Sequence, residues 1–260
     1  MNILVTGASG FIGKNLVKAL ALNGHQVFEF SSSDGDIAEY DFINRYAVHG
    51  IDFVYHLAGK TFVPHSWNDP SLFLQVNTQG TLNILDFCRK RSLPLLFVSA
   101  YVYGNTVKMP VSELCPPDPN NPYALSKFFA EKLCSFYSQY HNMDINIFRP
   151  FNVYGVGQDN RFLVPEIFSQ VIQGKSIEVN TLTPKRDYIY IDDLIRALLL
   201  GMSHLDGLGV YNIGSGSSLS VSEAIDIIQN EMGTNLEVQS KNLERANEIT
   251  DVVADIQNAR

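Results

Sequence analysis

The stretch that decides the fold runs from Asn2 to Gly13 and reads NILVTGASGFIG. A short apolar run leads into a glycine-rich turn, and an apolar pattern with helical spacing follows at 11–22. Gly7 permits a tight turn, Gly10 lets the backbone approach a pyrophosphate, and Gly13 lets the helix pack on the strand. Free N–H groups at the start of such a helix attract anions. The stretch therefore predicts a dinucleotide site, with expected contacts from Gly7, Ser9, Gly10, Phe11, Ile12 and Gly13.

The rest of the first half repeats this alternation of strand and helix. Apolar runs of strand length occur at 26–30, 53–57, 94–99 and 145–148, and helical patterns occur near 72–91 and 123–140. Strands that alternate with helices of this length are typical of a parallel sheet with helices on both faces. We therefore predict an α/β fold, a doubly wound (Rossmann) parallel sheet, for residues 1–150.

After Pro150 the alternation gives way to loops rich in Gly, Asn and Pro, with shorter strand and helix patterns. Helices are expected near 165–173, 192–202 and 220–232, and short strands at 177–180 and 188–191. We predict a smaller C-terminal substrate-binding lobe made of residues 151–186 and 213–260, with 187–212 packing back onto the first lobe. A cleft between two lobes is the usual place for a ligand.

Composition narrows the class of protein. The chain has 260 residues, 45% of them hydrophobic, and 19 Lys and Arg against 27 Asp and Glu, a net charge of −8. This excludes a disordered chain and gives no basic footprint for nucleic acid. No window approaches 18 continuous apolar residues and no signal-peptide pattern begins the chain, so we expect no membrane partner and a cytoplasmic protein. Three cysteines without CxxC spacing predict reduced thiols and no metal site.

The cofactor's identity stays open from the sequence. An acid about 20 residues after the glycine loop usually holds the ribose 2′-hydroxyl of NAD, but the second strand ends in Ser31-Ser-Ser33. Those hydroxyls suit a 2′-phosphate, yet no Lys or Arg lies between Lys18 and Arg45 to neutralise it. Both NAD and NADP therefore remain candidates. Further expected cofactor contacts are Ser31, Asp36 and Ile37, with the Asp36 carboxylate against the adenine amino group.

Tyr123 and Lys127 carry the candidate chemistry. They stand four residues apart at the start of an amphipathic helical pattern, so they share one helix face. A phenol titrates near pH ~10 in water, and a neighbouring cation is needed before it exchanges protons readily at neutral pH. Ser99 closes an apolar strand, where its hydroxyl would hold a substrate oxygen beside the phenol.

Seven motifs, in order, resemble the extended short-chain dehydrogenase/reductases, in the nucleotide-sugar epimerase/dehydratase branch. The likeness runs from Met1 almost to Arg260. The motifs are Gly7 to Gly13, Tyr55-His-Leu-Ala-Gly59, Asn77-Thr-Gln-Gly-Thr81, Phe97-Val-Ser-Ala-Tyr-Val-Tyr-Gly104, Tyr123 to Lys127, Arg149-Pro-Phe-Asn-Val-Tyr-Gly155 and Arg186-Asp-Tyr-Ile-Tyr-Ile-Asp-Asp193.

The resemblance implies a role for each matching residue. Tyr123 would be the catalytic acid/base, Lys127 would bind the nicotinamide ribose and lower the phenol's pKa, and Ser99 would hydrogen-bond the sugar oxygen. The remaining implied cofactor contacts are Leu57, Ala58, Gly59 and Asn77. The implied substrate contacts are Ser66 on the sugar side, Asn152 and Arg186 on the diphosphate, and Arg161 as a weaker candidate. A homodimer that pairs through two long helices of the first lobe is also implied.

The departures from the family pattern bear on the activity. Ala100 and Tyr101 stand where the family's dehydratases carry acids, which disfavours loss of water from the sugar. The family also continues beyond the Ala-Asp-Ile segment at 254–256, so we expect a shortened C-terminus. The leading hypothesis is a 4-epimerase of a nucleoside-diphosphate sugar. Its rivals are an NAD(P)H-dependent reductase of 4-keto-6-deoxy sugars and a non-catalytic dinucleotide sensor or scaffold.

Overall fold

The computed structural model describes residues 1–39, 43–105, 108–243 and 248–260. Its centre is a parallel sheet of six strands in the order β2-β1-β3-β4-β5-β9. The strands are β1 (Asn2–Thr6), β2 (Gln26–Phe30), β3 (Phe53–His56), β4 (Leu95–Val98), β5 (Ile145–Pro150) and β9 (Leu208–Ile213). β3, β4 and β5 are buried along their whole length, as strands covered on both faces should be. The α/β prediction with a doubly wound parallel sheet is confirmed.

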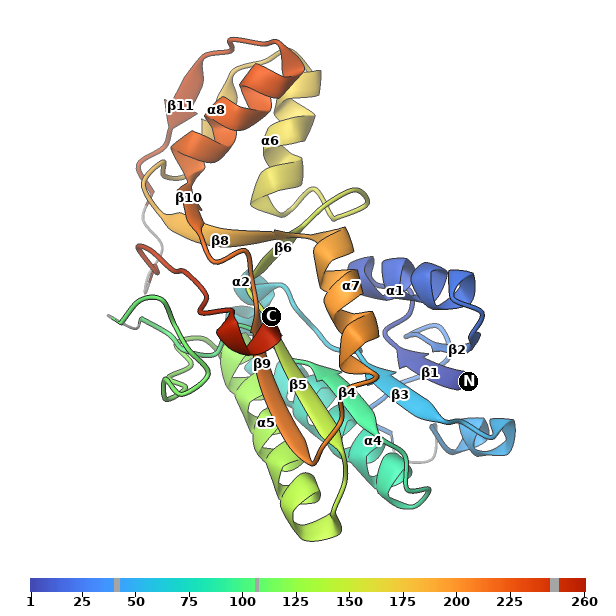
Figure 1. Ribbon diagram of the computed structural model, residues 1–260. Coiled ribbons are helices and arrows are strands. Elements are labelled where there is room, and N and C mark those ends of the chain that lie inside the picture. The colour runs from blue at the N-terminus through green and yellow to red at the C-terminus, as the bar shows by residue number, and fades with distance from the viewer. Residues whose placement is uncertain (40–42, 106–107, 244–247) are drawn as a thin grey trace.

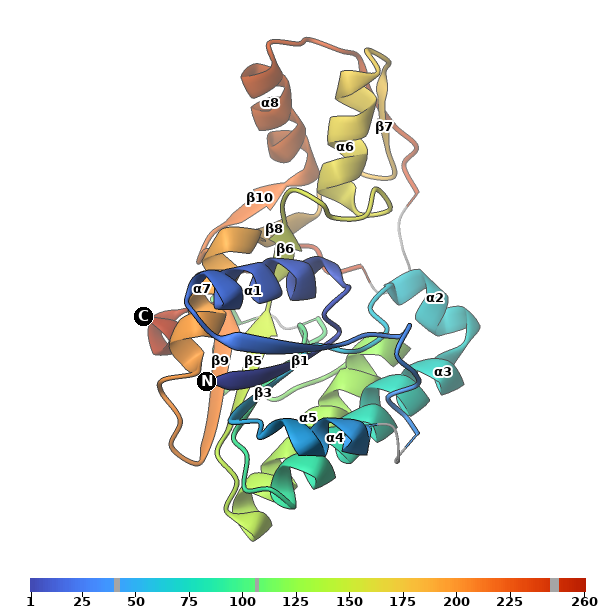
Figure 2. The same ribbon diagram turned by 90° about the vertical axis from the view of Figure 1, so that its right-hand side faces the viewer.

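Helices cover both faces of this sheet (Figure 2). One face carries α1 (Phe11–Leu22) and α7 (Ile191–Gly201), whose apolar sides form one core cluster with β1, β3, β4 and β5. The other face carries α4 (Gly80–Arg89), α5 (Pro122–His141) and the 3₁₀ segment η1 (Ile43–His49). The helical pattern expected at 72–91 is divided into α3 (Pro70–Leu74), a π-helical turn η2 (Gln75–Gln79) and α4. A short helix α2 (Val63–Asn68) precedes them.

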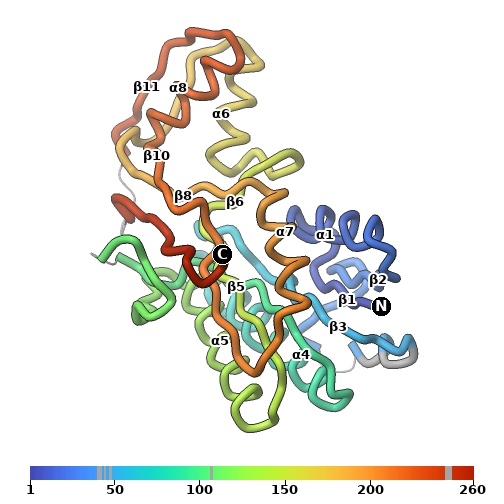
Figure 3. The backbone as a smooth tube through the Cα atoms, viewed as in Figure 1, coloured from blue at the N-terminus to red at the C-terminus, as the bar shows by residue number. Residues whose placement is uncertain are grey.

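The second lobe is built from two stretches of chain that leave the main sheet and return to it (Figures 1 and 3). Its elements are β6 (Asn152–Tyr154), α6 (Leu163–Ile172), β7 (Ile177–Val179), β8 (Lys185–Tyr190), β10 (Ser218–Ser220), α8 (Val221–Met232) and β11 (Val238–Ser240). The strands form two small sheets, β10-β8-β6 and β11-β7. α6 and α8 pack together over a separate apolar core. A last 3₁₀ turn, η3 (Gln257–Ala259), returns to the first lobe beside β9.

Two elements between these stretches belong to the first lobe. α7 packs beside α1, and β9 pairs with β5 in parallel from Ile145↔Leu208 to Pro150↔Ile213. Asp187, on the strand β8 that leads into α7, is fully buried. Its carboxylate accepts hydrogen bonds from the backbone amides of Ser215, Gly216 and Ala254. One carboxylate thus holds β8, the loop before β10 and the C-terminal segment together.

Strand order reverses at β1, because β1 pairs with β2 on one side and β3 on the other. In doubly wound sheets ligands bind at the carboxyl ends of the strands beside such a reversal. The loops after β1 and β3 meet there, where the backbone N–H of Ala58 donates to Thr6 Oγ1 (3.2 Å). Thr6 Oγ1 also contacts the buried His56 ring (2.8 Å). Burial lowers the pKa of His56 to about 3, so this imidazole is a neutral structural link.

Candidate active site

The glycine loop has the shape that a dinucleotide requires. Gly7 has a positive φ of 73°, and a Cβ added there would lie 2.7 Å from the Ala58 nitrogen. A Cβ at Gly13 would lie 2.1 Å from the Gly7 carbonyl oxygen, whereas one at Gly10 would meet only that oxygen, at 3.2 Å. Among the described residues, no side chain caps α1. The first N–H groups of α1 therefore stay free for an anion, so this loop fits the pyrophosphate of a dinucleotide.

The other expected cofactor contacts take different positions. Ser9 is exposed on the loop, and Phe11 and Ile12 are half-buried against the α1–α7 core. Ile37 is buried in the opposite core, where it fills the space that a Cβ at Gly80 would need. Asp36 is exposed, and its carboxylate accepts from the Ala38 amide (2.9 Å).

Asn77 joins the loop after β3 to α5. Its amide group accepts from the Lys60 N–H (2.7 Å) and donates to the Lys60 carbonyl (3.0 Å) and to Ser126 Oγ (2.8 Å). It lies in the π-helical turn η2 and is buried. π-helical turns are frequent at functional sites, because they redirect one side chain out of the regular helix pattern. Here that side chain holds the backbone of Lys60 against Ser126 of α5.

α5 presents the candidate chemistry on one face. Asn121 caps its N-terminus by accepting from the Ala124 amide (2.9 Å), and Pro122 occupies the first turn. Tyr123, Lys127 and Glu131 follow at intervals of four residues. This spacing places their side chains along one stripe of the helix.

Lys127 is 4% exposed, with its ammonium 4.2 Å from the centroid of the Phe97 ring on β4. Burial lowers the pKa of Lys127 to about 8. The nearby charge of Glu131 acts in the opposite direction but does not offset the burial. The lysine is therefore a cation at neutral pH that deprotonates far more easily than an exposed one.

Tyr123 is half-buried, and its ring packs edge-on against Phe73 of α3, with centroids 6.3 Å apart. Its hydroxyl makes no hydrogen bond with the described residues. Burial raises the pKa of Tyr123 above its usual value, and the Lys127 charge is not among the causes of the shift. Without ligands the phenol is therefore protonated at neutral pH.

Ser99 donates its hydroxyl proton to Glu131 Oε1 at 2.5 Å. Glu131 is also bound by Arg149, whose Nε and Nη2 donate to its two carboxylate oxygens at 3.0 and 2.6 Å. Burial alone would lower the pKa of Arg149, but the hydrogen bonds and charge of Glu131 more than offset it and the pKa is raised. The Ser99 oxygen thus has only its lone pairs left, so in this state it accepts hydrogen bonds rather than donating them.

The same network continues toward β9. Arg149 Nη1 donates to the Tyr103 hydroxyl (2.7 Å), which donates to Asn212 Oδ1 (2.7 Å). Asn212 in turn donates to the Val111 carbonyl (2.9 Å). Five buried side chains, from the loop after β4, α5, β5 and β9, are thereby held in one chain of hydrogen bonds that ends at Ser99.

The expected substrate residues are spread along the second lobe and α2. Asn152 donates to the Asp187 carbonyl (3.2 Å). Arg186 forms an ion pair with Glu248 and donates to the Ile249 carbonyl (2.6 Å), so its guanidinium already has partners. Ser66 is fully buried and donates to the Val63 carbonyl (2.7 Å).

Arg161 is exposed and pairs with Asp159, while its guanidinium lies 4.8 Å from the centroid of the Phe62 ring. Phe62 precedes α2 in the first lobe and contacts Phe162 of the second lobe, with centroids 6.1 Å apart. Arg161 therefore lies where the two lobes meet, and its guanidinium is exposed to solvent. The Ser66 hydroxyl, in contrast, is fully buried.

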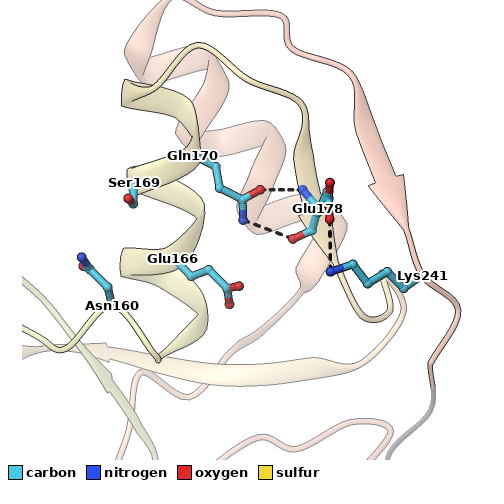
Figure 4. A pocket seen from close by; sticks show the side chains of 6 residues that line it. All are labelled: Asn160, Glu166, Ser169, Gln170, Glu178 and Lys241. Carbon is cyan, nitrogen blue, oxygen red and sulfur yellow. Dashed lines mark hydrogen bonds and ion pairs between the residues drawn. The ribbon is translucent and has the colours of Figure 1, made fainter.

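A pocket of about 260 Å³ in the second lobe has none of these residues in its lining (Figure 4). Polar side chains of α6, β7 and their neighbours line it, and Glu178 bridges Gln170 and Lys241 across it.

Within the described ranges, no group of three or more His, Cys, Asp or Glu is placed to hold a metal ion, and no helix is long and apolar enough to cross a membrane.

Four residues of this network were not singled out as functional residues from the sequence. They are Glu131, Arg149, Tyr103 and Asn212, which hold Ser99 and one another. A signal for Glu131 was present, because it stands four residues after Lys127 on the same helix face. A charged residue on a face that must pack against a sheet requires a buried partner.

The match to known proteins covers most of the chain. The model of the NAD dependent epimerase/dehydratase family matches residues 3–214. The chain belongs to this family. GDP-6-deoxy-D-mannose reductase from Pseudomonas aeruginosa is 33% identical, over 91% of this chain and 82% of the relative. Membership confirms the predicted family and makes the chain an NAD(P)-dependent enzyme of nucleotide-sugar chemistry.

Solved structures of the family show the same fold. UDP-glucose 4-epimerase from Thermus thermophilus, in complex with NAD, has a TM-score of 0.91 at 28% identity and covers 100% of this chain and 92% of its own. The structure of RMD from Pseudomonas aeruginosa, complexed with NADPH, has a TM-score of 0.90 at 32% identity, with coverages of 99% and 90%. Structural neighbours thus bind either NAD or NADPH, as the sequence predicted for the cofactor class.

Proposed function

We propose that this protein is a 4-epimerase of a nucleoside-diphosphate sugar. The observation that carries this proposal is the face of α5, which presents Tyr123 together with a buried, cationic Lys127. The Lys127 ammonium lies against the loop after β3, 4.0 Å from where a Cβ at Gly59 would stand. A nicotinamide dinucleotide held by these loops would supply the hydride chemistry at C4 of the sugar. Tyr123 would exchange the proton of the C4 hydroxyl, and Lys127 would hold the nicotinamide ribose.

Dehydratase chemistry is less well supported. Ala100 is buried, and Tyr101 donates its hydroxyl to the Gly104 carbonyl (2.8 Å). Neither side chain is a carboxylic acid, and the Tyr101 hydroxyl is already used in a backbone hydrogen bond. In this proposal Asn152, Arg161 and Arg186 would bind the diphosphate and sugar, which requires Arg186 to exchange its partner Glu248 for the substrate.

A 4-ketoreductase is the second candidate, because one relative is the GDP-6-deoxy-D-mannose reductase of Pseudomonas aeruginosa. It would use the same tyrosine and lysine once per turnover. The protein should be purified without added cofactor, denatured, and the released dinucleotide identified by mass spectrometry. About one dinucleotide per chain, with epimerisation of a UDP- or GDP-hexose without added cofactor, would support the epimerase. Stoichiometric consumption of NAD(P)H with a 4-keto-6-deoxy sugar would contradict it and support the reductase.

The ionisation of Lys127 should make the activity of the enzyme depend on pH. Because the pKa of Lys127 is lowered to about 8, the cation is present below that pH and is lost as the pH rises through it. We therefore expect kcat/KM to fall above about pH 8. Lys127→Arg, whose guanidinium stays charged, should move this fall to higher pH. An alkaline limb at the same pH in both proteins would assign it to another group.

We also propose a homodimer that pairs through α5. Phe129, Phe136 and Tyr140 are 42, 50 and 63% exposed and lie along one side of this helix. Phe136→Glu is expected to halve the mass measured by analytical ultracentrifugation. Ile227→Glu, a control at a similarly exposed position on α8, should leave the mass unchanged. A wild-type protein that sediments as a single chain at all concentrations would refute the dimer.

The three free, buried cysteines agree with a reducing compartment, and we propose the cytoplasm.

A further inference from the structure

The end of β2 adjoins the glycine loop directly. The carbonyl oxygen of Phe30, the last residue of β2, accepts from the backbone N–H groups of Gly7 (2.8 Å) and Ala8 (3.1 Å). The next residue, Ser31, therefore lies beside the loop that would bind the pyrophosphate. In dinucleotide-binding sheets the adenosine ribose reaches this strand end. A charged side chain at the end of β2 would therefore lie next to the 2′ position of the ribose.

A carboxylate folds back onto this strand end from three residues further along the chain. Asp34 Oδ2 accepts from the Ser31 N–H and from the Ser31 hydroxyl, both at 2.8 Å. Ser31 Oγ is also 2.7 Å from Ser33 Oγ. These hydrogen bonds from Ser31 hold the pKa of Asp34 below its usual value, so the carboxylate is charged at neutral pH. Its other oxygen, Oδ1, has no hydrogen-bond partner among the described residues.

We propose that Asp34 selects the cofactor, by accepting a hydrogen bond from the ribose 2′-hydroxyl of NAD(H) and repelling the 2′-phosphate of NADP(H). The missing acid at the end of β2 is thus supplied by the loop. A 2′-phosphate brings at least one further negative charge close to Asp34, and like charges about 4 Å apart repel enough near a protein surface to weaken binding about tenfold or more. Arg45 lies near enough for its charge to act on Asp34, and it is the cation that would have to offset this repulsion.

This inference deepens the proposed function, because it assumes that a dinucleotide binds at the glycine loop. Isothermal titration calorimetry of the full chain with NADH and with NADPH measures the preference without any turnover. We expect NADH to bind at least about tenfold more tightly. Asp34→Asn keeps an amide oxygen that accepts the Ser31 bonds while removing the charge, so it should reduce the ratio of the two affinities about tenfold. Glu29→Gln removes the same charge from β2 itself and should leave the ratio unchanged.

The outcomes separate this inference from the function. Equal or tighter binding of NADPH by the wild-type protein would overturn the role of Asp34 and leave the enzyme class untouched. A ratio that Asp34→Asn does not change, or that Glu29→Gln changes equally, would also overturn it. Failure to bind either dinucleotide would refute the proposed function together with this inference. A crystal of the NADH complex with Asp34 Oδ1 within hydrogen-bond distance of the 2′-oxygen would support it directly.

Discussion

Tyr123→Phe is expected to lower kcat by about 10²–10⁴-fold, the usual contribution of a positioned acid or base. The substitution removes only a hydroxyl that makes no hydrogen bond with the described residues, while the ring keeps its edge-on contact with Phe73. Folding and dinucleotide affinity should therefore stay close to those of the wild-type protein. The measurement is single-turnover hydride transfer with the nucleotide sugar identified as substrate, together with calorimetric binding of the cofactor.

Tyr137→Phe is the matched control for this experiment. It deletes a hydroxyl from the same helix, near the end remote from the glycine loop, and should leave the rate unchanged. If Tyr123→Phe turned over at the wild-type rate, the phenol would have no part in proton transfer. If it lost cofactor affinity by the same factor as its rate, Tyr123 would be a binding residue and not an acid or base.

The predictions from sequence succeeded where short stretches of chain determine the structure. Residues 2–13 form a strand, a turn and a helix as expected, because the glycines and the apolar pattern are local signals. The helix expected at 123–140 is α5, with Asn121 as its cap. Spacing alone placed Tyr123 and Lys127 on one face, since a helix repeats every 3.6 residues.

The sequence could not specify contacts made across the sheet. Ser99 and Glu131 are 32 residues apart in the chain, and Arg149 contacts Glu131 from strand β5. No local pattern states which hydroxyl faces which carboxylate. The π-helical turn at Asn77 also interrupts a helical pattern that looks continuous in the sequence. The role proposed for Asp34 also depends on a contact that is not local to the strand pattern, because this acid follows the strand end and returns to it through a turn.

Glu131→Ala is expected to destabilise the fold by about 3–5 kcal/mol, because it leaves the Arg149 guanidinium buried without its counter-ion. The side chains of Arg149 and Glu131 are only 7 and 4% exposed, so water cannot replace the lost carboxylate. The measurement is equilibrium unfolding in urea. Glu178→Ala breaks an ion pair whose side chains are both 51% exposed, and it should cost no more than about 1 kcal/mol.

The double variant Glu131→Leu with Arg149→Met distinguishes a buried unpaired charge from a simple loss of packing. Removing both charges together should cost less than Glu131→Ala alone, since no ion is then left without a partner. A double variant at least as unstable as the single one would mean that packing, and not charge, governs this part of the core. In either protein Ser99 loses its carboxylate acceptor and can turn its proton toward the substrate. If kcat changes under conditions where both variants are fully folded, Glu131 positions the Ser99 hydroxyl for catalysis.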